Sequence, residues 1–203
     1  PGYHGAGHRR ACRARAEGSV LPTTHWTRNM NDRWRPSVTV AAVIEQDGRF
    51  LLVEEHTPEG LQLNNPAGHL EPGETPLQAV VREALEETGR AFEPEALLGI
   101  YMARFVRPAP EAAAPGEGDA EDVTYLRFAY RGRVGEPLPG RTLDTGIVRT
   151  LWMTPEEIAR ESARHRSPLV MRCIEDHRAG QCHPLGLVQA DLSLVEPRIL
   201  ARR

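Results

Sequence analysis

The segment TPLQAVVREALEETG, residues 75–89, most constrains the fold because it contains the start and stop signals of a helix. Thr75 suits the N-cap, Pro76 suits the first helical position, and Gln78 completes a capping box. Gly89 supplies a typical helix end. At about 100° per residue, the apolar side chains fall on one arc that should pack on a sheet. These side chains are Leu77, Val80, Val81, Ala84 and Leu85.

Patterns typical of β-strands surround this helix. Two apolar runs flank Asp47-Gly48, a dipeptide that favours a tight hairpin. Residues 57–75 are rich in Pro, Gly, Asn and Glu and predict a long loop. We therefore expect an α/β fold with a mixed sheet. Further strands are expected at 97–106, 123–134 and 147–153, and further helices start at Thr154 and at Ser167, the second ending near Gly180.

The charge of the chain is unevenly distributed. The net charge is −3 over 203 residues, yet residues 1–30 contain five arginines and one acidic residue. We interpret residues 1–30 as a disordered basic tail or a non-native leader, because they show neither helical nor strand periodicity. Residues 31–203 are then acidic and are expected to form one domain. A broad basic face for nucleic acid is not expected there.

The apolar runs and the cysteines bear on the location of the protein. No apolar run in the sequence approaches the length needed to cross a bilayer, so no membrane partner is expected. The three cysteines are too few and too scattered for a disulfide framework and suit a reducing compartment, which favours the cytoplasm. The sequence leaves a monomer or a homodimer open.

Three carboxylates crowd the last turns of the predicted helix. Glu83, Glu86 and Glu87 lie at positions i, i+3 and i+4, where like charges repel by roughly 0.2–0.5 kcal/mol per pair. The helix dipole destabilises each of them by roughly 0.3–1 kcal/mol. One interpretation is a solvated acidic face softened by Arg82 and Arg90. The other is a divalent cation, Mg²⁺ or Mn²⁺, which would convert both penalties into attraction.

The loop before the helix favours the cation. Gly68 and Gly73 suit sharp backbone turns, and Glu74 adds a carboxylate at the helix entrance. The spacing resembles the signature of the Nudix hydrolase family, which implies a Nudix-type α/β/α sandwich and hydrolysis of phosphoric anhydride bonds. The matching positions are Gly68, Glu74 after five residues, Arg82-Glu83 after seven more, then Glu86-Glu87 and Gly89.

The resemblance implies roles for the acids and for one backbone carbonyl. Glu83 and Glu87 would be direct ligands of Mg²⁺ or Mn²⁺, and Glu86 would be a ligand or the group that orients the attacking water. The Gly68 carbonyl would add a backbone ligand. Arg90 stands where the family has an aliphatic residue, so we expect a slot in the helix-to-sheet packing to be lost.

The resemblance also implies supporting roles. Glu74 and Arg82 would form an ion pair that holds the loop onto the helix, beside the catalytic carboxylates. The general base stays open between Glu86 and an acid of residues 111–122, such as Glu121 or Asp122, which lie in an expected surface loop.

Longer stretches around and beyond the signature indicate the substrate class. NNPAGHLEPGET and TYLRFAY resemble the bacterial NudJ branch of phosphatases, which act on nucleoside tri- and diphosphates and on hydroxymethylpyrimidine pyrophosphate of thiamine metabolism. The alternatives are an ADP-ribose or dinucleoside polyphosphate pyrophosphatase, or a non-catalytic module that senses a nucleotide. A sensor would have no need of three repelling carboxylates, so a small phosphorylated substrate is expected.

Other candidate sites are weaker. Four residues could form a zinc site, but their spacing matches no common zinc module. Two histidines could contact phosphate, although a structural role is the simpler expectation. Alternating aromatic residues suit the core, and one of them could stack on a base. The zinc candidates are Cys173, His177, Cys182 and His183, the histidines are His56 and His69, and the aromatic residues are Phe105, Tyr125, Phe128 and Tyr130.

Overall fold

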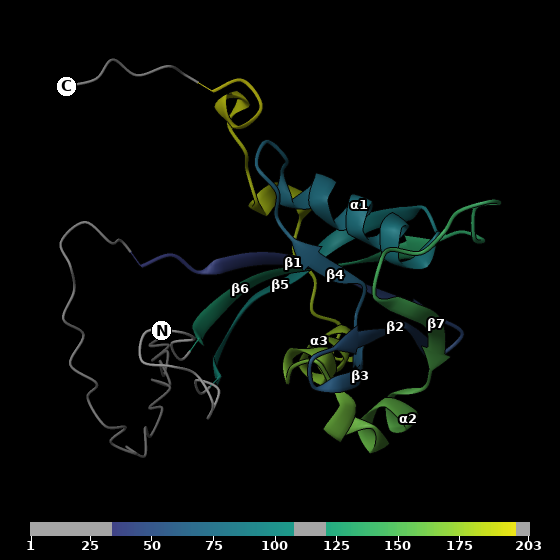
Figure 1. Cartoon of the computed structure of the whole chain (residues 1–203). Helices are drawn as coiled ribbons and strands as arrows, with labels where there is room; N and C mark the ends of the chain where they lie inside the picture. Colours follow the sequence, from purple (N-terminus) through teal and green to yellow (C-terminus); the bar gives the residue numbers. More distant parts are fainter. Residues whose placement is uncertain (1–33, 108–120, 198–203) are drawn as a thin grey trace, which may run out of the picture. The chain divides into compact units, whose positions relative to one another are not determined.

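The computed structural model of the protein describes residues 34–107 and 121–197 (Figure 1). The basic segment 1–30 and most of the loop expected at 108–122 lie outside the described residues. No helix within the described residues is long and apolar enough to cross a membrane. The strands are β1 (Ser37–Gln46), β2 (Arg49–Thr57), β3 (Gly60–Asn64), β4 (Ala67–His69), β5 (Phe92–Arg107), β6 (Glu121–Val134) and β7 (Ile147–Met153). The α-helices are α1 (Pro76–Thr88), α2 (Pro155–Arg160) and α3 (Leu169–Arg178), and 3-10 turns follow at Ser162–Arg164, Leu185–Leu187 and Leu192–Leu194.

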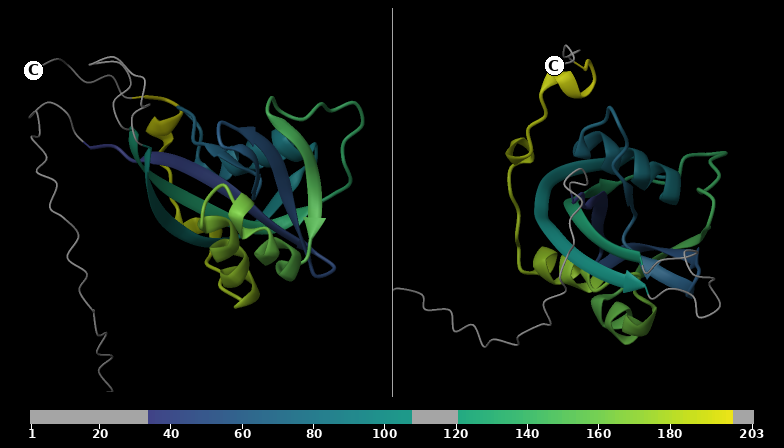
Figure 2. Two further views of the ribbon diagram at one scale, coloured as in Figure 1. Left: turned by 60° about the horizontal axis from the view of Figure 1, so that its bottom comes forward. Right: turned by 60° about the vertical axis from the view of Figure 1, so that its left-hand side comes forward.

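The strands form one mixed sheet. The order is β3-β2-β1-β6-β5, with β4 paired to β1 and β7 paired to β2. β1 and β6 run parallel, whereas β5 and β6 pair antiparallel over their whole length. Figure 2 shows that the long strands β5 and β6 curve strongly. The mixed sheet expected from the sequence is confirmed.

β1 lies in the middle of the sandwich, with helices on both faces of the sheet. Val40 and Ala42 pack in the core cluster under α1, whereas Ala41 and Val43 belong to the cluster that includes Ile158 of α2 and α3 side chains. Because both faces are covered, β1 is a continuous apolar run. Figure 1 shows α1 on one side of the sheet and α2 and α3 on the other, which is the expected α/β/α sandwich.

The predicted hairpin and the predicted helix ends are present. Asp47 and Gly48 have φ angles of 51° and 74°, as a tight turn with two left-handed residues requires. In α1, Thr75 and Gln78 form the reciprocal capping box, and Gly89 ends the helix with φ of 66°. The apolar stripe differs slightly from expectation, because Ala79 is fully buried and Leu85 is only half-buried.

The prediction of one long loop over residues 57–75 is wrong in part, since β3 and β4 lie within it. The Thr57 hydroxyl donates to the Gly60 carbonyl at 2.9 Å and closes a tight turn, so that residues 60–64 pair with β2. Residues 67–69 pair with β1. Both strands are short and Pro66 lies between them, so the composition of this segment resembles that of a loop.

Arg90 fills the slot where an aliphatic side chain was expected. Its guanidinium lies 5.9 Å from the ring centroid of Trp152, within the range of a cation–π contact. Its Nη1 donates to the Gly135 carbonyl at 2.7 Å. The side chain is only 15% exposed. The aliphatic stem of Arg90 and its guanidinium near Trp152 therefore occupy the position of the aliphatic residue, although Arg90 belongs to neither core cluster.

Candidate active site

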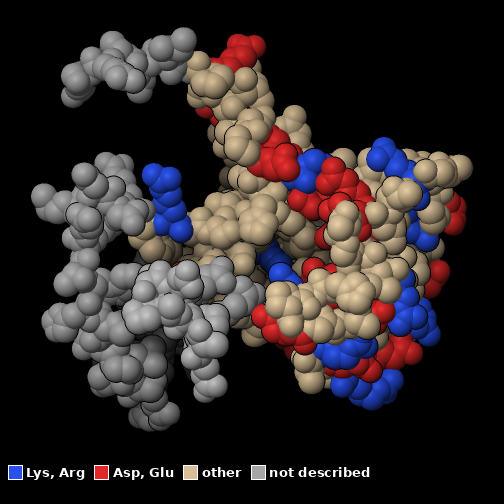
Figure 3. All heavy atoms as spheres, in the orientation of Figure 1, with Lys and Arg blue, Asp and Glu red and all other residues tan. Residues whose placement is uncertain are grey.

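Two of the three acids of α1 point inward, toward β4. Glu83 and Glu87 are only 8% and 7% exposed, whereas the Glu86 side chain is 42% exposed. The backbone N–H of Ala67 in β4 donates to Glu87 Oε2 at 2.8 Å. The solvated acidic face that was one interpretation of the sequence therefore describes Glu86 alone. Figure 3 shows Asp and Glu side chains gathered over α1.

Gly68 brings β4 against the helix. It pairs with Val40 in β1, and a β-carbon at this position would lie 2.1 Å from Cδ of Glu83. The sequence indicated a sharp turn at Gly68, and this prediction is wrong: the residue lies in a strand and its hydrogen allows a close approach. Gly73, with φ of 88°, does make the expected turn. The Gly68 backbone and the Glu83 carboxylate therefore adjoin.

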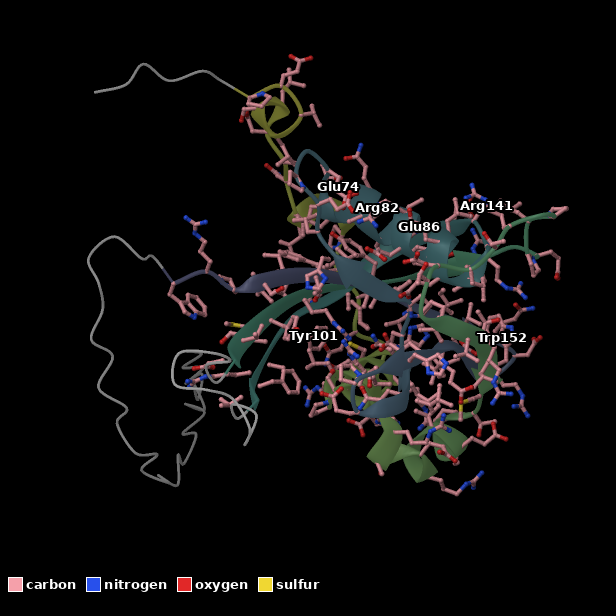
Figure 4. All side chains as sticks on the ribbon, in the orientation of Figure 1. Glu74, Arg82, Glu86, Tyr101, Arg141 and Trp152 are labelled. Carbon is pink, nitrogen blue, oxygen red and sulfur yellow. The ribbon has the colours of Figure 1, made fainter. Side chains whose placement is uncertain are left out.

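Arg82 ties the preceding loop to the helix. Its Nη2 donates to Glu74 Oε1 at 2.6 Å and its Nε donates to Glu74 Oε2 at 3.0 Å, which forms the expected ion pair. Nη2 also donates to the His69 carbonyl at 3.0 Å. This hydrogen-bonded guanidinium holds the pKa of Glu74 below its usual value. Figure 4 shows Arg82 and Glu86 on α1 and Glu74 close to the start of this helix.

Arg82 also contacts two carboxylates of the acidic trio. Its Nη1 donates to Glu83 Oε1 at 2.7 Å and to Glu86 Oε2 at 3.0 Å. Within the described residues, no group of three or more His, Cys, Asp or Glu side chains is arranged so that it could hold a metal ion. In this arrangement Arg82 binds Glu83 and Glu86, whereas Glu87 accepts from the Ala67 backbone N–H.

The buried carboxylates carry an electrostatic penalty. Burial raises the pKa of Glu83, and burial together with the charges of Glu83, Glu55 and Asp144 raises the pKa of Glu87 to about 8. Both shifts mean that the charged form is destabilised in the folded protein. A divalent cation would reverse this penalty, and a set of carboxylate and carbonyl oxygens is the chemistry that Mg²⁺ and Mn²⁺ prefer. The oxygen chemistry of these residues therefore suits such an ion, whereas the described side chains do not converge around one point.

Two further acids lie near the trio and were missed from the sequence. Glu55 in β2 has its Oε1 buried without a hydrogen-bond partner among the described residues. Asp144 follows β6 in a turn, and its backbone N–H donates to the Glu86 carbonyl at 2.9 Å. An acid inside the apolar run LLVEEH was the one available signal for Glu55. Asp144 gave no signal, because only the tertiary fold brings it to α1.

A cavity of about 220 Å³ reaches Gly68, the β4 residue that lies against Glu83. Residues of β1, β4, β5 and β6 contribute to its lining, and residues just before α3 close one side. Gly68 and Glu55 line it at the end near the acids, and Arg127 and Arg166 also line it. The remaining lining residues are Thr39, Asn64, Ala67, His69, Ala103, Phe105, Val123, Tyr125, Ser167 and Leu169.

Of the other candidate residues, Phe105, Tyr125 and His69 lie at the cavity, whereas Tyr130 is buried in the core. The Asp122 carboxylate is held by Arg104, with Nε to Oδ1 at 2.7 Å, and does not line the cavity. The Glu121 side chain and residues 111–120 lie outside what the structure describes.

The four zinc candidates form no metal-binding group within the described chain. Cys173 is buried in the core, which raises the pKa of its thiol to about 11, whereas Cys182 is exposed. His177 packs edge-on against Phe50, with ring centroids 5.3 Å apart. The zinc alternative is therefore wrong for these residues, because Cys173 and His177 pack in the interior whereas Cys182 and His183 are exposed.

Comparison with known proteins identifies the class of this fold and site. A family model described as "NUDIX domain" matches residues 33–191. The chain belongs to the Nudix family and is a hydrolase. The resemblance inferred from the glycine and glutamate spacing is confirmed.

Individual relatives refine this assignment. The chain is 34% identical to "Phosphatase NudJ" of Escherichia coli K12 over 155 residues, which cover 76% of this chain and 92% of that protein. The solved structure of a "NUDIX hydrolase from Nitrosomonas europaea" is 51% identical in sequence. The match covers 77% of this chain and 98% of that protein, with a TM-score of 0.65. A MutT NUDIX hydrolase from Burkholderia pseudomallei shares the fold. It is 22% identical, the match covers 70% of this chain and 98% of that protein, and the TM-score is 0.53. The chain is thus a homologue of NudJ phosphatases.

Proposed function

We propose that the protein is a Mg²⁺- or Mn²⁺-dependent phosphohydrolase that cleaves nucleoside tri- or diphosphates, or hydroxymethylpyrimidine pyrophosphate of thiamine metabolism. The burial of Glu83 and Glu87 beside each other carries this proposal. Burial destabilises the charged form of both inward-facing carboxylates, and a cation bound between them would remove this penalty. The similarity to NudJ phosphatases supports the substrate class.

The residues of α1 and β4 would hold the ion. We assign Glu83, Glu87 and the Gly68 carbonyl as ligands, since these groups adjoin across the contact between α1 and β4. A bound divalent ion supplies charge that neutralises phosphate oxygens and acidifies a water molecule. Glu86, the exposed member of the trio, serves as a further ligand or orients the attacking water.

Arg82 and Glu74 act on this site as positioning residues. Arg82 bonds the His69 carbonyl and both Glu74 oxygens, so it fixes the chain on either side of the loop that follows Gly68. Among the candidate bases we favour Glu86, since the Asp122 carboxylate is already bound by Arg104. Glu86 would accept the proton of the attacking water.

Phosphorus NMR of products formed in ¹⁸O-labelled water tests the proposal. The substrates are GTP, hydroxymethylpyrimidine pyrophosphate and ADP-ribose, each with Mg²⁺ and with Mn²⁺. We expect metal-dependent cleavage of the first or second, with the label on the attacked phosphorus. Cleavage of ADP-ribose alone would favour the pyrophosphatase alternative. The absence of turnover across a wider panel that includes dinucleoside polyphosphates would indicate a nucleotide sensor.

A further inference from the structure

A buried arginine in the cavity lacks hydrogen-bond partners. Arg127 in β6 is 7% exposed, and its Nε and Nη1 have no partner among the described residues. A guanidinium carries five N–H donors, and burying them without acceptors costs free energy. Arg127 pairs across the sheet with Thr39 of β1, whose buried hydroxyl is also without a partner in the described chain. Within the described residues, none of the α1 acids forms a hydrogen bond with the Arg127 guanidinium.

A second arginine faces the same cavity. Arg166 lines it from the segment before α3, and its backbone N–H donates to the Leu63 carbonyl at 2.9 Å, which fixes the residue beside the end of β3. Burial lowers the pKa of Arg127, and the charge of Arg166 lowers it further, although Glu55 and Glu87 act in the opposite direction. Two like charges thus share one small cavity.

We propose that Arg127 and Arg166 bind a phosphoryl group of the substrate, next to the phosphoryl group that is attacked at the α1 carboxylates. This assignment rests on the proposed function and identifies its substrate as a molecule with adjoining phosphoryl groups. A phosphoryl group offers negative charge and several acceptor oxygens, which satisfy both guanidinium groups and the Thr39 hydroxyl together.

The lining of the cavity supports the same assignment. Gly68, whose carbonyl is assigned as a metal ligand, and Glu55 line this cavity of about 220 Å³ together with the two arginines, so the cavity extends from the backbone of the proposed metal site to the guanidinium groups. Ligand pockets for larger molecules typically have about 300–1,000 Å³. This space suits part of a substrate, such as a short phosphate chain. A heteroaromatic ring against Phe105 and Tyr125 is the competing occupant of the basic end.

Binding of inorganic phosphate to the metal-free protein tests the proposal apart from turnover. The variants are Arg127→Met and Arg166→Met, with Arg178→Met as the matched control, because Arg178 is exposed at the end of α3 and does not line the cavity. In EDTA, calorimetry should show phosphate binding to the wild-type protein and to the control. Each cavity variant should bind phosphate at least about 10-fold more weakly, as expected for charged hydrogen bonds.

Kinetics and a nucleoside titration complete the test. Each cavity variant should raise KM for the best pyrophosphate substrate at least about 10-fold, while Arg127→Lys, which keeps the charge, should recover part of the loss. Absence of phosphate binding to the wild-type protein, or equal binding by Arg166→Met, would overturn the proposal. A loss of unphosphorylated nucleoside binding with phosphate binding retained would overturn it in favour of a ring. Failure of the proposed function would instead appear as no metal-dependent turnover by the wild-type protein.

Discussion

Gly68 and Glu83 approach so closely that a β-carbon on the glycine would lie 2.1 Å from the carboxylate carbon of the glutamate. β4 and α1 therefore meet at a point where only hydrogen fits. The backbone of one element and the carboxylate of the other become neighbours without any side chain between them. This contact explains why a glycine stands at a position that is neither a turn nor left-handed.

Gly68→Ala should displace the Glu83 carboxylate and lower kcat at least about 100-fold. The methyl group cannot be accommodated unless Glu83 moves, and small displacements of catalytic groups are costly on this scale. Steady-state kinetics with Mg²⁺ measures the effect. Gly186→Ala is the matched control, because no atom lies within 4 Å of its added β-carbon. Equal kcat in the two variants would contradict the role of this contact.

Glu86→Gln should lower kcat at least about 100-fold, because an amide of nearly the same shape cannot accept the proton of the attacking water. The fold should survive, since the Glu86 side chain is 42% exposed. Glu156→Gln, an exposed glutamate in the first turn of α2, serves as the control. Turnover at the wild-type rate in Glu86→Gln would remove this carboxylate from the mechanism.

Glu87 should make the stability of the metal-free protein depend on pH. Its pKa is raised from 4.5 to about 8, so the folded state holds this proton more tightly than the unfolded chain. The resulting stabilisation is complete below about pH 4.5 and is lost as the pH rises to about 8. Urea unfolding in EDTA between pH 5 and pH 8.5 measures this decline. Glu87→Gln should flatten it, and an identical slope in both proteins would show that other groups cause it.

Arg82→Lys should separate charge from geometry at the entrance of α1. The ammonium group keeps the charge but cannot bond Glu74, Glu83 and the His69 carbonyl at once, as the planar guanidinium does. We expect kcat to fall about 10-fold and the free energy of unfolding to fall by about 1–2 kcal/mol. Kinetics and urea unfolding measure the two effects. Arg133→Lys, at an exposed ion pair, should change neither.

Local signals allowed the helix and its ends to be predicted from the sequence. The Thr75 and Gln78 side chains and the left-handed Gly89 act within a few residues of each other, so their roles do not depend on distant segments. β3 and β4 could not be predicted in the same way. Their residues read as a loop, and they become strands only because β2 and β1 offer edges to pair with.

The residues of the candidate site also fall into a group that the sequence predicts and a group that it does not. The acids of α1, Glu74 and Gly68 share one continuous segment whose spacing is visible in the sequence. Glu55, Asp144 and Arg127 come from three other parts of the chain, and tertiary packing alone brings them to the cavity and to α1. Their positions depend on strand pairing and on the contact of Asp144 with α1, which no local pattern encodes.

Calorimetric titration of the wild-type protein with Mg²⁺ and with Mn²⁺ tests the central claim most directly. We expect binding of a divalent ion at pH 8, enhanced by a phosphorylated ligand, and loss of that binding in Glu87→Gln. Thermal unfolding should show the same pattern, with metal raising the Tm of the wild-type protein alone. If neither ion binds, with or without a phosphorylated ligand, the buried pair of Glu83 and Glu87 does not serve as a metal site and the proposed mechanism is wrong.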